Sequence, residues 1–493
     1  MCAAVPPSSV AAPRGKKARR RGTPRSNHKT TASAARITPP PVNGASTRRL
    51  DPPRQAAAGG LHARRSPPLA PTVCRASTGD HAAIGQVLSI VFPGSTGEAY
   101  LATLDDPFYE PPDRLLIKHN SQLVAHLRLT HRELIFGRQR WPVAGLFQLG
   151  TLPEFRGRGY AGRLLEAAHR QMAETGAELG LLSTDIPHFF RPAGWAVCGR
   201  HSHLRVAAQD LLAHLSQTER ASKSDGAISV RPWRQVELPA LMRLYAQHTR
   251  ESFGPLHRGE AYWRWLLSRP GYDEIYVAIQ GPDRLNLEEY GQDGSQSPLV
   301  GYAVTKDDRI LELVTAPGNQ DAAAKLLARA AREAIERYHH GVTLHAAPND
   351  PLGQWLRAAG GVQHFHEAHQ GEVLMAKVLQ PINFLQSLCP LLHARADACR
   401  LPRPCELGLL LEGEKHRLIF SSRSVKLKSN KVGRSYLCLN GAEFTRLVLG
   451  HTDVAQATAR GRMEASTRIA LQTARAVFPQ LPLWRPPWDD QLP

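Results

Sequence analysis

The segment 146–176 constrains the fold most, because it joins an apolar run to a glycine-rich turn and then to an amphipathic pattern. The run 146–151 has strand character, and the turn 156–162 carries three glycines and two arginines. Apolar residues at helical spacing then predict a helix from about Tyr160, with Gly176 as its C-cap. The turn therefore gathers backbone N–H groups, two guanidinium groups and the positive end of a helix dipole. This combination predicts a binding site for a phosphate or pyrophosphate.

Two kinds of site use such a turn. Gly157, Gly159 and Gly162 fit the G-x-G-x-x-G fingerprint of dinucleotide-binding folds, and Asp185 ends the next apolar run, where a ribose-binding acid belongs. In those folds, however, the first glycine follows its strand directly and the motif opens the domain. Here residues 152–156 intervene, and three strand-like runs precede the motif. The sequence therefore disfavours a dinucleotide site.

The alternative pattern is Arg156-x-x-Gly159-x-Ala161, preceded by Pro-Glu-Phe. It resembles the acetyl-CoA loop of the GNAT superfamily of N-acetyltransferases. The resemblance implies acetyl-CoA as the acetyl donor, a primary amine that attacks the thioester directly, and cofactor contacts from the strand end and the loop. Asp185 is either a helix N-cap or a further contact. The cofactor-binding residues expected are Leu149, Gly150, Thr151, Arg156, Gly157, Arg158, Gly159, Tyr160, Ala161, Gly162, Asp185 and Ile186.

The length of 493 residues predicts several domains, and the charge is unevenly spread. Residues 1–75 hold 15 of the 62 Lys and Arg but a single acid, Asp51. Together with its Pro and Ala content, this predicts a disordered basic arm over residues 1–72. The arm is either a solvated tail, which an upstream start codon in the gene model could have added, or a weak tether to nucleic acid.

The order of strand-like and helix-like runs predicts an acetyltransferase domain over 73–215 and a second, degenerate GNAT-like domain over 227–378. In the second domain the segment 316–320 replaces the motif, so no cofactor site is expected there. Residues 379–493 resemble a sterol carrier protein-like domain with an extended tail. This order resembles the enhanced-intracellular-survival (Eis) acetyltransferases. The fold class expected is therefore α/β (α+β), with two tandem GNAT-like domains, and the resemblance implies a homo-oligomer, a trimer or hexamer.

The catalytic residues follow from the same resemblance. In the GNAT superfamily a tyrosine hydroxyl usually protonates the leaving thiolate, but Phe190 holds that position here and cannot donate a proton. A water or a neighbouring group must replace it, or the chemistry is impaired. His188 is either an exposed histidine at a helix start or part of the site. In the Eis group the base is the C-terminal carboxylate, here that of Pro493, with a frayed terminus as the alternative.

Two functions remain open on the sequence. The first is an acetyl-CoA-dependent N-acetyltransferase acting on a primary amine of a small polyamine- or aminoglycoside-like molecule or of a protein lysine. The second is a catalytically impaired relative that binds CoA, a lipid or a partner. The seven cysteines are scattered, which predicts a reducing, cytoplasmic location. The histidine-rich segments lack an accompanying carboxylate or cysteine pattern, so no metal site is predicted. No apolar run is long enough to span a membrane.

Overall fold

The computed structural model describes residues 72–490 apart from 95, 200, 222–227, 282, 284–297, 349, 367–372 and 482. The strands of this part form three sheets, and the fold belongs to the mixed α/β class, as predicted. The predicted basic arm lies, except for its last residue, outside the described part. No helix within the described part combines the length and the apolar character that crossing a membrane requires.

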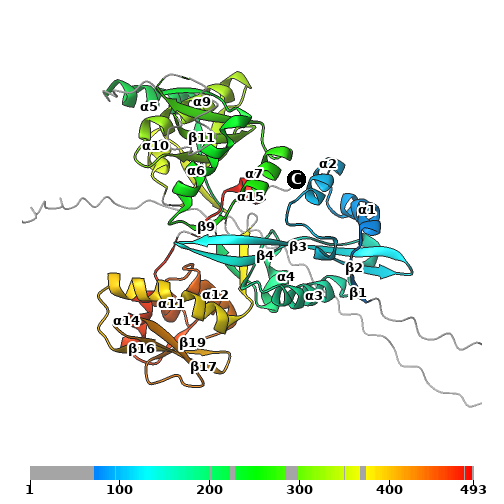
Figure 1. Ribbon diagram of the computed structural model, residues 1–493, viewed down its shortest axis with the longest axis vertical. Coiled ribbons are helices and arrows are strands. Elements are labelled where there is room, and N and C mark those ends of the chain that lie inside the picture. The colour runs from blue at the N-terminus through cyan, green and yellow to red at the C-terminus, as the bar shows by residue number, and fades with distance from the viewer. Residues whose placement is uncertain are drawn as a thin grey trace, which may run out of the picture. The chain divides into compact units, whose positions relative to one another are not determined.

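The first sheet carries the glycine-rich turn. Its strands β3 and β4 form a long antiparallel hairpin, whereas β5 runs parallel to β4. Figure 1 shows α1 (His81–Val91) and α2 (Gly97–Leu104) on one face of this sheet, with α3 (Tyr160–Glu174) and α4 (Pro187–Phe190) on the other. The strand order is β1 (Val73–Arg75), β2 (Arg114–His119), β3 (Gln122–Phe136), β4 (Gln139–Thr151), β5 (Leu179–Thr184), β15 (Val373–Val378) and β6 (Ala196–Gly199), with β9 (Phe253–Leu256) paired to the end of β3.

Helix α3 confirms the prediction of a helix from about Tyr160. Its apolar residues Leu164, Leu165, Ala168 and Met172 are all buried in the core beneath the first sheet. Full burial of a large apolar side chain stabilises a fold by about 1.5–3 kcal/mol. The amphipathic pattern therefore fixes which side of α3 faces the sheet, and with it the direction in which the helix N-terminus points.

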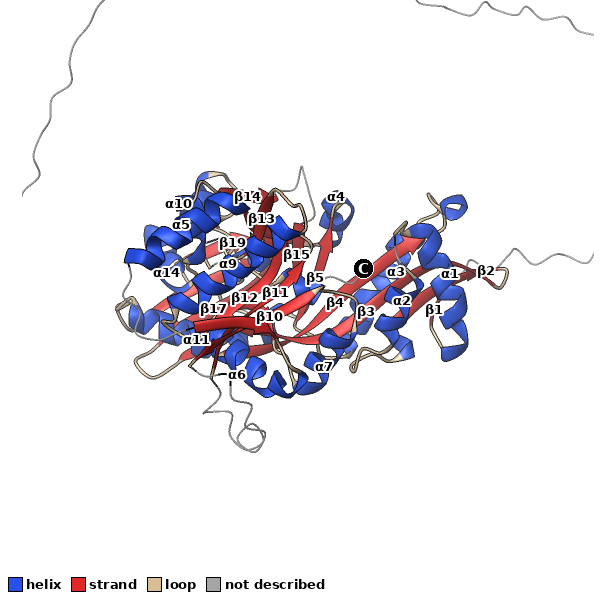
Figure 2. Ribbon diagram, turned by 90° about the horizontal axis from the view of Figure 1, so that it is seen from above, coloured by secondary structure: helices blue, strands red, loops and turns tan. Residues whose placement is uncertain are grey.

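The second sheet contains most of the strands between residues 201 and 366. Helices α5 (Ala208–Ala221) and α9 (Gln320–Glu336) lie together beside it (Figure 2), and α6 (Leu238–Thr249), α7 (Glu260–Ser268) and α10 (Leu352–Ala358) complete this region. The strand order is β14 (Val362–His366), β7 (His201–Ala207), β13 (Gly341–His345), β12 (Arg309–Thr315), β11 (Leu299–Lys306), β10 (Glu274–Gln280) and β8 (Ile228–Pro232).

Two strands cross between these sheets. Strand β7 directly follows β6 in the chain, but it pairs with β13 and β14 of the second sheet. Strand β15 follows β14, but it pairs with β5 and β6 of the first sheet. Neither sheet is therefore built from one continuous stretch of chain. The domain boundaries at 215 and 227 stay a prediction, and the pairing shows that strands on either side of them are exchanged.

The third sheet has five strands in the order β18 (Val425–Ser429), β17 (Glu414–Phe420), β16 (Cys405–Leu411), β19 (Tyr436–Leu439) and β20 (Glu464–Ala465). Its helices are α11 (Pro381–Ala398), α12 (Gly441–Val448), α13 (Val454–Ala459) and α14 (Arg468–Val477). A buried cluster continues from this sheet into the other two; Trp141 of β4, for example, meets Phe384 of α11 with ring centroids 4.6 Å apart. The likeness to a sterol carrier protein stays a prediction.

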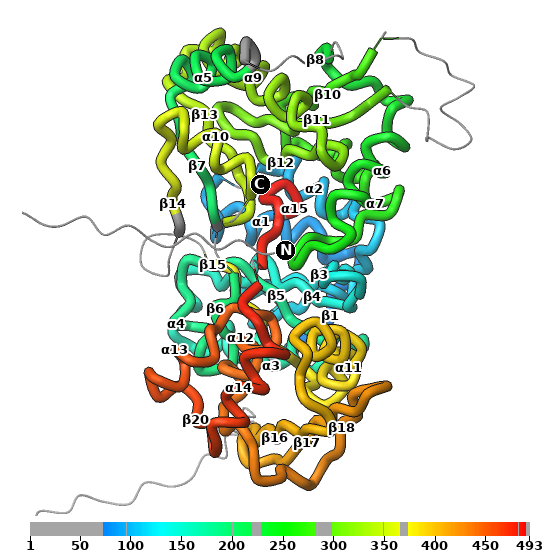
Figure 3. Tube along the Cα trace, turned by 90° about the vertical axis from the view of Figure 1, so that its left-hand side faces the viewer, coloured from blue at the N-terminus to red at the C-terminus, as the bar shows by residue number. Residues whose placement is uncertain are grey.

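The C-terminal segment returns from the third sheet to the first two. The backbone N–H of Trp484 donates to the carbonyl of Phe253 in β9 at 3.0 Å. The segment then forms the short helix α15 (Pro487–Asp490), seen in red beside α7 in Figure 1 and traced in Figure 3. Residues 484–490, called the tail below, therefore lie at the place where elements of the first and second sheets meet.

Candidate active site

The glycine-rich turn forms an open cradle at the start of α3. Gly157 and Gly159 have φ angles of +76° and +77°, a left-handed backbone that favours glycine. Gly159 is the N-cap of α3 and supplies no side-chain cap, so the first N–H groups of the helix have no partner within it. A Cβ atom added at Gly157, Gly159 or Gly162 would meet no neighbouring heavy atom within 4 Å. The turn therefore has the geometry of an anion site, with open space around its three glycines.

The two arginines of the turn are exposed and bind back to it. Arg156 Nε donates to the carbonyl of Thr151 at 3.2 Å, and Arg158 Nη2 donates to the carbonyl of Glu154 at the same distance. The Arg158 guanidinium also lies 4.9 Å from the ring centre of Phe155. These contacts hold positive charge close to the open N–H groups. By contrast, the Tyr160 side chain is buried beneath α3, so its backbone is the part that faces the turn.

Strands β4 and β5 separate next to the turn. They pair in parallel from Val143 and Leu179 to Gly145 and Leu181. Beyond that point β4 continues to Thr151 and β5 to Thr184, and the described structure shows no further pairing between them. The predicted strand residues 149–151 all lie on this separated part. The hydroxyl oxygens of Thr151 and Ser183 are buried there without a hydrogen-bond partner among the described residues, which is what a site for a polar ligand leaves behind.

A bulge in β4 is held by a buried histidine of β3. Gln148 has a φ of +52°, and the β3–β4 register shifts beside it. Burial and the charge of Arg114 lower the pKa of His126 to about 3, so the ring is neutral. Nδ1 therefore donates to the Gln148 carbonyl at 3.0 Å, and Nε2 accepts from Arg114 at 3.1 Å. His126 thus sets the shape of the separated part of β4.

The packing of α1 on β4 explains why residue 150 is a glycine. A Cβ at this position would lie 2.6 Å from Val91 Cγ1 and 3.1 Å from a ring carbon of Phe92, at the end of α1. The glycine is therefore required because α1 packs closely on β4. A role of its backbone in holding a cofactor stays a prediction.

The predicted catalytic positions differ in their surroundings. Phe190 is buried among Phe189 and Trp195, with ring centroids 4.9 and 6.3 Å away, and it has no proton to give. His188, Asp185 and Ile186 are exposed. The N-cap of α4 is Ile186, so the N-cap role considered for Asp185 is wrong. Pro493 lies outside the described residues. No group of three His, Cys, Asp or Glu in the described chain is arranged to hold a metal ion.

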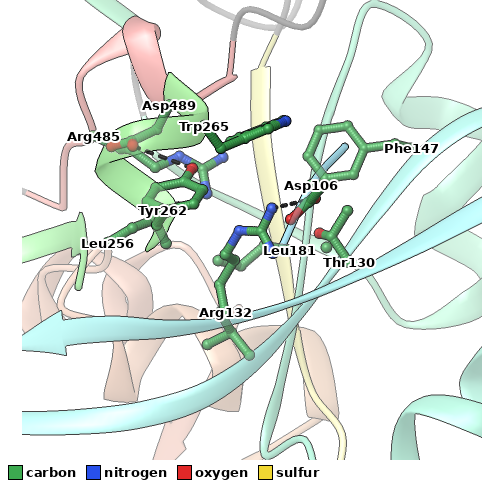
Figure 4. A pocket seen from close by; sticks show the side chains of 12 residues that line it. Asp106, Thr130, Arg132, Phe147, Leu181, Leu256, Tyr262, Trp265, Arg485 and Asp489 are labelled. Carbon is green, nitrogen blue, oxygen red and sulfur yellow. Dashed lines mark hydrogen bonds and ion pairs between the residues drawn. The ribbon is translucent and has the colours of Figure 1, made fainter. Parts of the chain in front are cut away.

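A small cavity lies where β4 and β5 begin to separate, on the face opposite α3. Its volume is about 30 Å³. Figure 4 shows Arg132 of β3 beside Asp106, with Tyr262 and Trp265 of α7 on the other side. The lining residues are Asp106, Thr130, Arg132, Val143, Gly145, Phe147, Leu181, Leu256, Tyr262, Trp265, Arg485 and Asp489. They come from the first sheet, from the segment after α2, from α7 and from the tail, so the set is assembled from distant parts of the chain.

The tail is fixed against this cavity by a buried ionic cluster. Arg258 donates to Glu312 at 2.6 Å and to Asp489 at 3.0 Å, and the Tyr302 hydroxyl donates to Glu312 at 2.6 Å. The Arg258 guanidinium also lies 4.0 Å from the ring centre of Tyr245. Burial acts to lower the pKa of Arg258, but the charges of Asp489 and Glu312 outweigh it and raise the pKa well above its usual value. The guanidinium therefore stays charged and holds Asp489 at the cavity wall.

The second sheet has a strand, turn and helix in the corresponding order, but there the helix N-terminus is capped by a side chain. The Asn319 side chain accepts from the N–H of Ala322 at 3.0 Å, and Asp321 adds negative charge to the first turn of α9. A larger cavity of about 340 Å³ lies nearby between β12, β13, α6 and the tail. It is lined by Tyr245, His248, Thr249, Glu251, Ser252, Phe253, Pro255, Glu312, Leu313, Val314, Leu344, His345, Ala346, Ala347, Asp350, Leu352, Trp484 and Pro486.

Comparison with known families identifies the first of these regions. Residues 72–198 match the family model described as an acetyltransferase (GNAT) domain. The part of the chain that contains the glycine-rich turn and the separated strands is therefore the part that matches a GNAT acetyltransferase domain. No curated protein matches the chain.

Solved structures resemble the chain over a longer stretch. A GCN5-related N-acetyltransferase from Anabaena variabilis is 18% identical, with a TM-score of 0.64 over 84% of this chain and 99% of its own. A probable N-acyltransferase from Enterococcus faecalis is 14% identical, with a TM-score of 0.66 over 84% and 98%. Eis1 from Mycobacterium abscessus is 15% identical, with a TM-score of 0.55 over 84% and 98%. At these identities the likeness shows a shared fold, which extends well beyond the GNAT domain.

Proposed function

We propose that the chain is an acetyl-CoA-dependent N-acetyltransferase that acts on a primary amine. The observation that carries this proposal is the open turn at the N-terminus of α3, placed beside the point where β4 and β5 separate. The GNAT domain match over residues 72–198 and the names of the similar structures support the same reaction class.

The residues present fit a ligand with a pyrophosphate and an amide-containing arm. The N–H groups of residues 157–162 and the α3 dipole would hold the pyrophosphate, with Arg156 and Arg158 adding charge. The free edge of β4 at residues 149–151 would form hydrogen bonds with the amides of the ligand, as a neighbouring strand would. When bound there, acetyl-CoA supplies the acetyl group as a thioester.

The amine enters from the opposite face, through the small cavity. Gly145, Phe147 and Leu181 line this cavity at the point of separation, so an amine held there reaches the donor side between the strands. The carboxylate of Pro493, which lies outside the described residues, remains the base we propose. The Ser183 hydroxyl is the proton donor we propose for the leaving thiolate, because it is buried beside the separated strands without a partner and Phe190 has no hydroxyl.

The acceptor and its setting belong to the proposal as well. A small polyamine- or aminoglycoside-like amine and a protein lysine are both compatible with the reaction. A cytoplasmic homo-oligomer is what the resemblance to the Eis group implies. The basic arm adds at most a weak interaction with nucleic acid.

A second function rests on Phe190. A chain that lacks the usual tyrosine could hold CoA, a lipid or a partner without acetylating anything. The two functions separate in one experiment with the full chain, which follows free thiol release from acetyl-CoA with a panel of primary amines. Thiol release with a matching acetylated product supports the enzyme. Binding of acetyl-CoA without thiol release, for every amine, contradicts the enzyme and supports the binding protein.

A further inference from the structure

Three arginines lie together on the side of the first sheet that faces α2, the side on which the amine would enter. Arg114 of β2 and Arg128 of β3 are opposite each other in the strand register, and Arg132 follows on β3. We call these three residues the arginine cluster. Arg114 and Arg128 are fully buried, and the Arg132 side chain is 8% exposed. Buried guanidinium groups normally pair with carboxylates, because burying a charge without a partner is costly.

The cluster has one carboxylate. Asp106 Oδ2 accepts from Arg128 Nη2 at 2.7 Å and from Arg132 Nη2 at 2.5 Å, while Oδ1 accepts from the N–H of Phe108 at 3.1 Å. Asp113 is next to Arg114 in the chain, but it binds His131 and the N–H of Glu110 instead. Among the described contacts, three positive charges therefore share a single negative one.

Arg114 has neutral partners in the described contacts. It donates to the Thr103 hydroxyl at 2.6 Å, to the Tyr109 hydroxyl at 3.2 Å and to the Gln148 side-chain oxygen at 3.3 Å. It also contacts the neutral ring of His126, and its guanidinium lies 5.1 and 5.2 Å from the ring centres of Tyr100 and Tyr109. These contacts orient the guanidinium, but none of them is a carboxylate.

Arg128 has unused donors. Its Nε and Nη1 atoms are buried and have no hydrogen-bond partner among the described residues. Burial and the charge of Arg114 lower its pKa to about 10, the direction expected of a cation in surplus positive charge. A planar fork of guanidinium donors matches a carboxylate or a phosphate. The unused donors of Arg128 therefore call for an anion.

The cluster borders the amine cavity. Asp106, which bridges Arg128 and Arg132, lines that cavity together with Arg132 and Thr130. Arg132 is held in place by aromatic rings, with centroids 4.8 Å away at Tyr262 and 5.1 Å away at Phe108. The cavity is small, about 30 Å³, which favours a compact planar anion such as a carboxylate over a larger one.

We propose that the arginine cluster binds a carboxylate on the acceptor, so the acceptor is an amine that also carries an acid and is not a polycation. This inference rests on the proposed function, since it names the acceptor class of the same site. The amine end of the acceptor lies toward Gly145, Phe147 and Leu181, and its carboxylate lies toward Arg128 and Arg132. An acceptor larger than the cavity requires the tail to shift from the position in which Arg258 holds Asp489.

The test compares amines that differ by their acid. The full chain is assayed with acetyl-CoA and 5-aminovalerate, pentylamine, spermidine or phosphoethanolamine. We expect kcat/KM for 5-aminovalerate to exceed that for pentylamine about tenfold or more, and the Arg128→Gln variant to lose that preference. Arg264→Gln, an exposed arginine of α7, is the matched control and keeps it. Equal or better use of pentylamine or spermidine by the unaltered chain overturns the proposal, as does a preference that survives Arg128→Gln. A preference for phosphoethanolamine over 5-aminovalerate overturns the assignment to a carboxylate.

A second measurement separates this inference from the proposed function. Binding of 5-aminovalerate without any donor is measured by calorimetry for the unaltered chain and for Arg128→Gln. Binding that the variant loses supports the cluster even if no amine is ever acetylated, and absence of binding in the unaltered chain overturns it. If Arg128→Gln does not fold, Asp106→Asn replaces it. Removing the one carboxylate should tighten 5-aminovalerate binding several-fold, and weaker binding by this variant contradicts the proposal.

Discussion

The start of α3 and the start of α9 have the same order of strand, turn and helix, yet only the first has the geometry of an anion site. At α3 the N-cap is Gly159, which adds no side chain, and the N–H groups face open space. At α9 the N-cap is Asn319, whose side chain takes up the N–H of Ala322, and Asp321 adds a negative charge. A helix N-terminus therefore binds an anion only where the chain leaves it uncapped. The cap residue, the charge in the first turn and the arginines of the turn together separate the two outcomes.

The largest expected effect is on stability and concerns Arg258, which links the walls of the two cavities. Its partner Glu312 lines the larger cavity and its partner Asp489 lines the smaller one. Arg258→Ala leaves two buried carboxylates without their cation, which should lower the free energy of unfolding by about 3–5 kcal/mol. Urea denaturation measures this loss, with the exposed Arg264→Ala as the control. A loss of stability no greater than that of the control would show that the ion pairs of Arg258 do not hold the tail.

The second effect is a pH dependence from His126. Its pKa of about 3 in the fold lies below its ordinary value of 6.5. The unfolded chain therefore takes up a proton first, so this contribution to stability is complete above pH 6.5 and is lost as the pH falls toward 3. The full difference is about 5 kcal/mol. Unfolding free energies measured from pH 7 to pH 4 should fall less steeply for His126→Gln than for the unaltered chain. Parallel curves would contradict the neutral, buried ring.

The third effect concerns the proton for the leaving thiolate. If the hydroxyl missing at Phe190 limits the reaction, Phe190→Tyr should raise kcat about tenfold. Phe189→Tyr adds the same hydroxyl to the neighbouring ring and should leave kcat unchanged. Ser183→Ala should lower kcat by about a hundredfold if Ser183 supplies the proton. Steady-state rates with a fixed amine measure all three, and an unchanged rate for Ser183→Ala removes Ser183 from the mechanism.

The smallest effect sharpens the comparison itself. Asn319→Ala removes the cap of α9 and should cost about 1 kcal/mol of stability. It should not create acetyl-CoA binding in the second region, because Asp321 remains and the loop lacks the arginines found at 156 and 158. Thermal unfolding and calorimetry together check both parts. A new binding site in the variant would mean that the cap alone separates the two regions.

The features predicted correctly from the sequence are those that depend only on residues close together in the chain. The spacing of Leu164, Leu165, Ala168 and Met172 gave the buried side of α3, and positive φ angles at Gly157 and Gly159 need only neighbouring residues to explain them. These features lie within one strand, turn and helix. Their outcome does not depend on the rest of the chain.

The rest depends on contacts between distant segments. Strand β7 lies beside β13 and β15 beside β5 because the two sheets exchange strands, and no periodicity reports such an exchange. Arg132 meets Tyr262 of α7, and Arg258 meets Asp489 of the tail, across more than a hundred residues of chain. From the sequence, Gly150 is predicted to bind the cofactor. In the structure, the close packing of Val91 is the reason that no side chain fits at this position.

The central claim is that the first region alone binds acetyl-CoA, and a matched pair of glycine variants tests it most directly. Gly159 and Gly318 both have left-handed φ angles and open space around them, so glutamate strains each turn similarly and adds the same charge. The affinity of the full chain for acetyl-CoA is measured by calorimetry in the unaltered form and in both variants. We expect micromolar binding that Gly159→Glu abolishes and Gly318→Glu retains. Binding that survives Gly159→Glu, or no binding by the unaltered chain, would contradict the central claim.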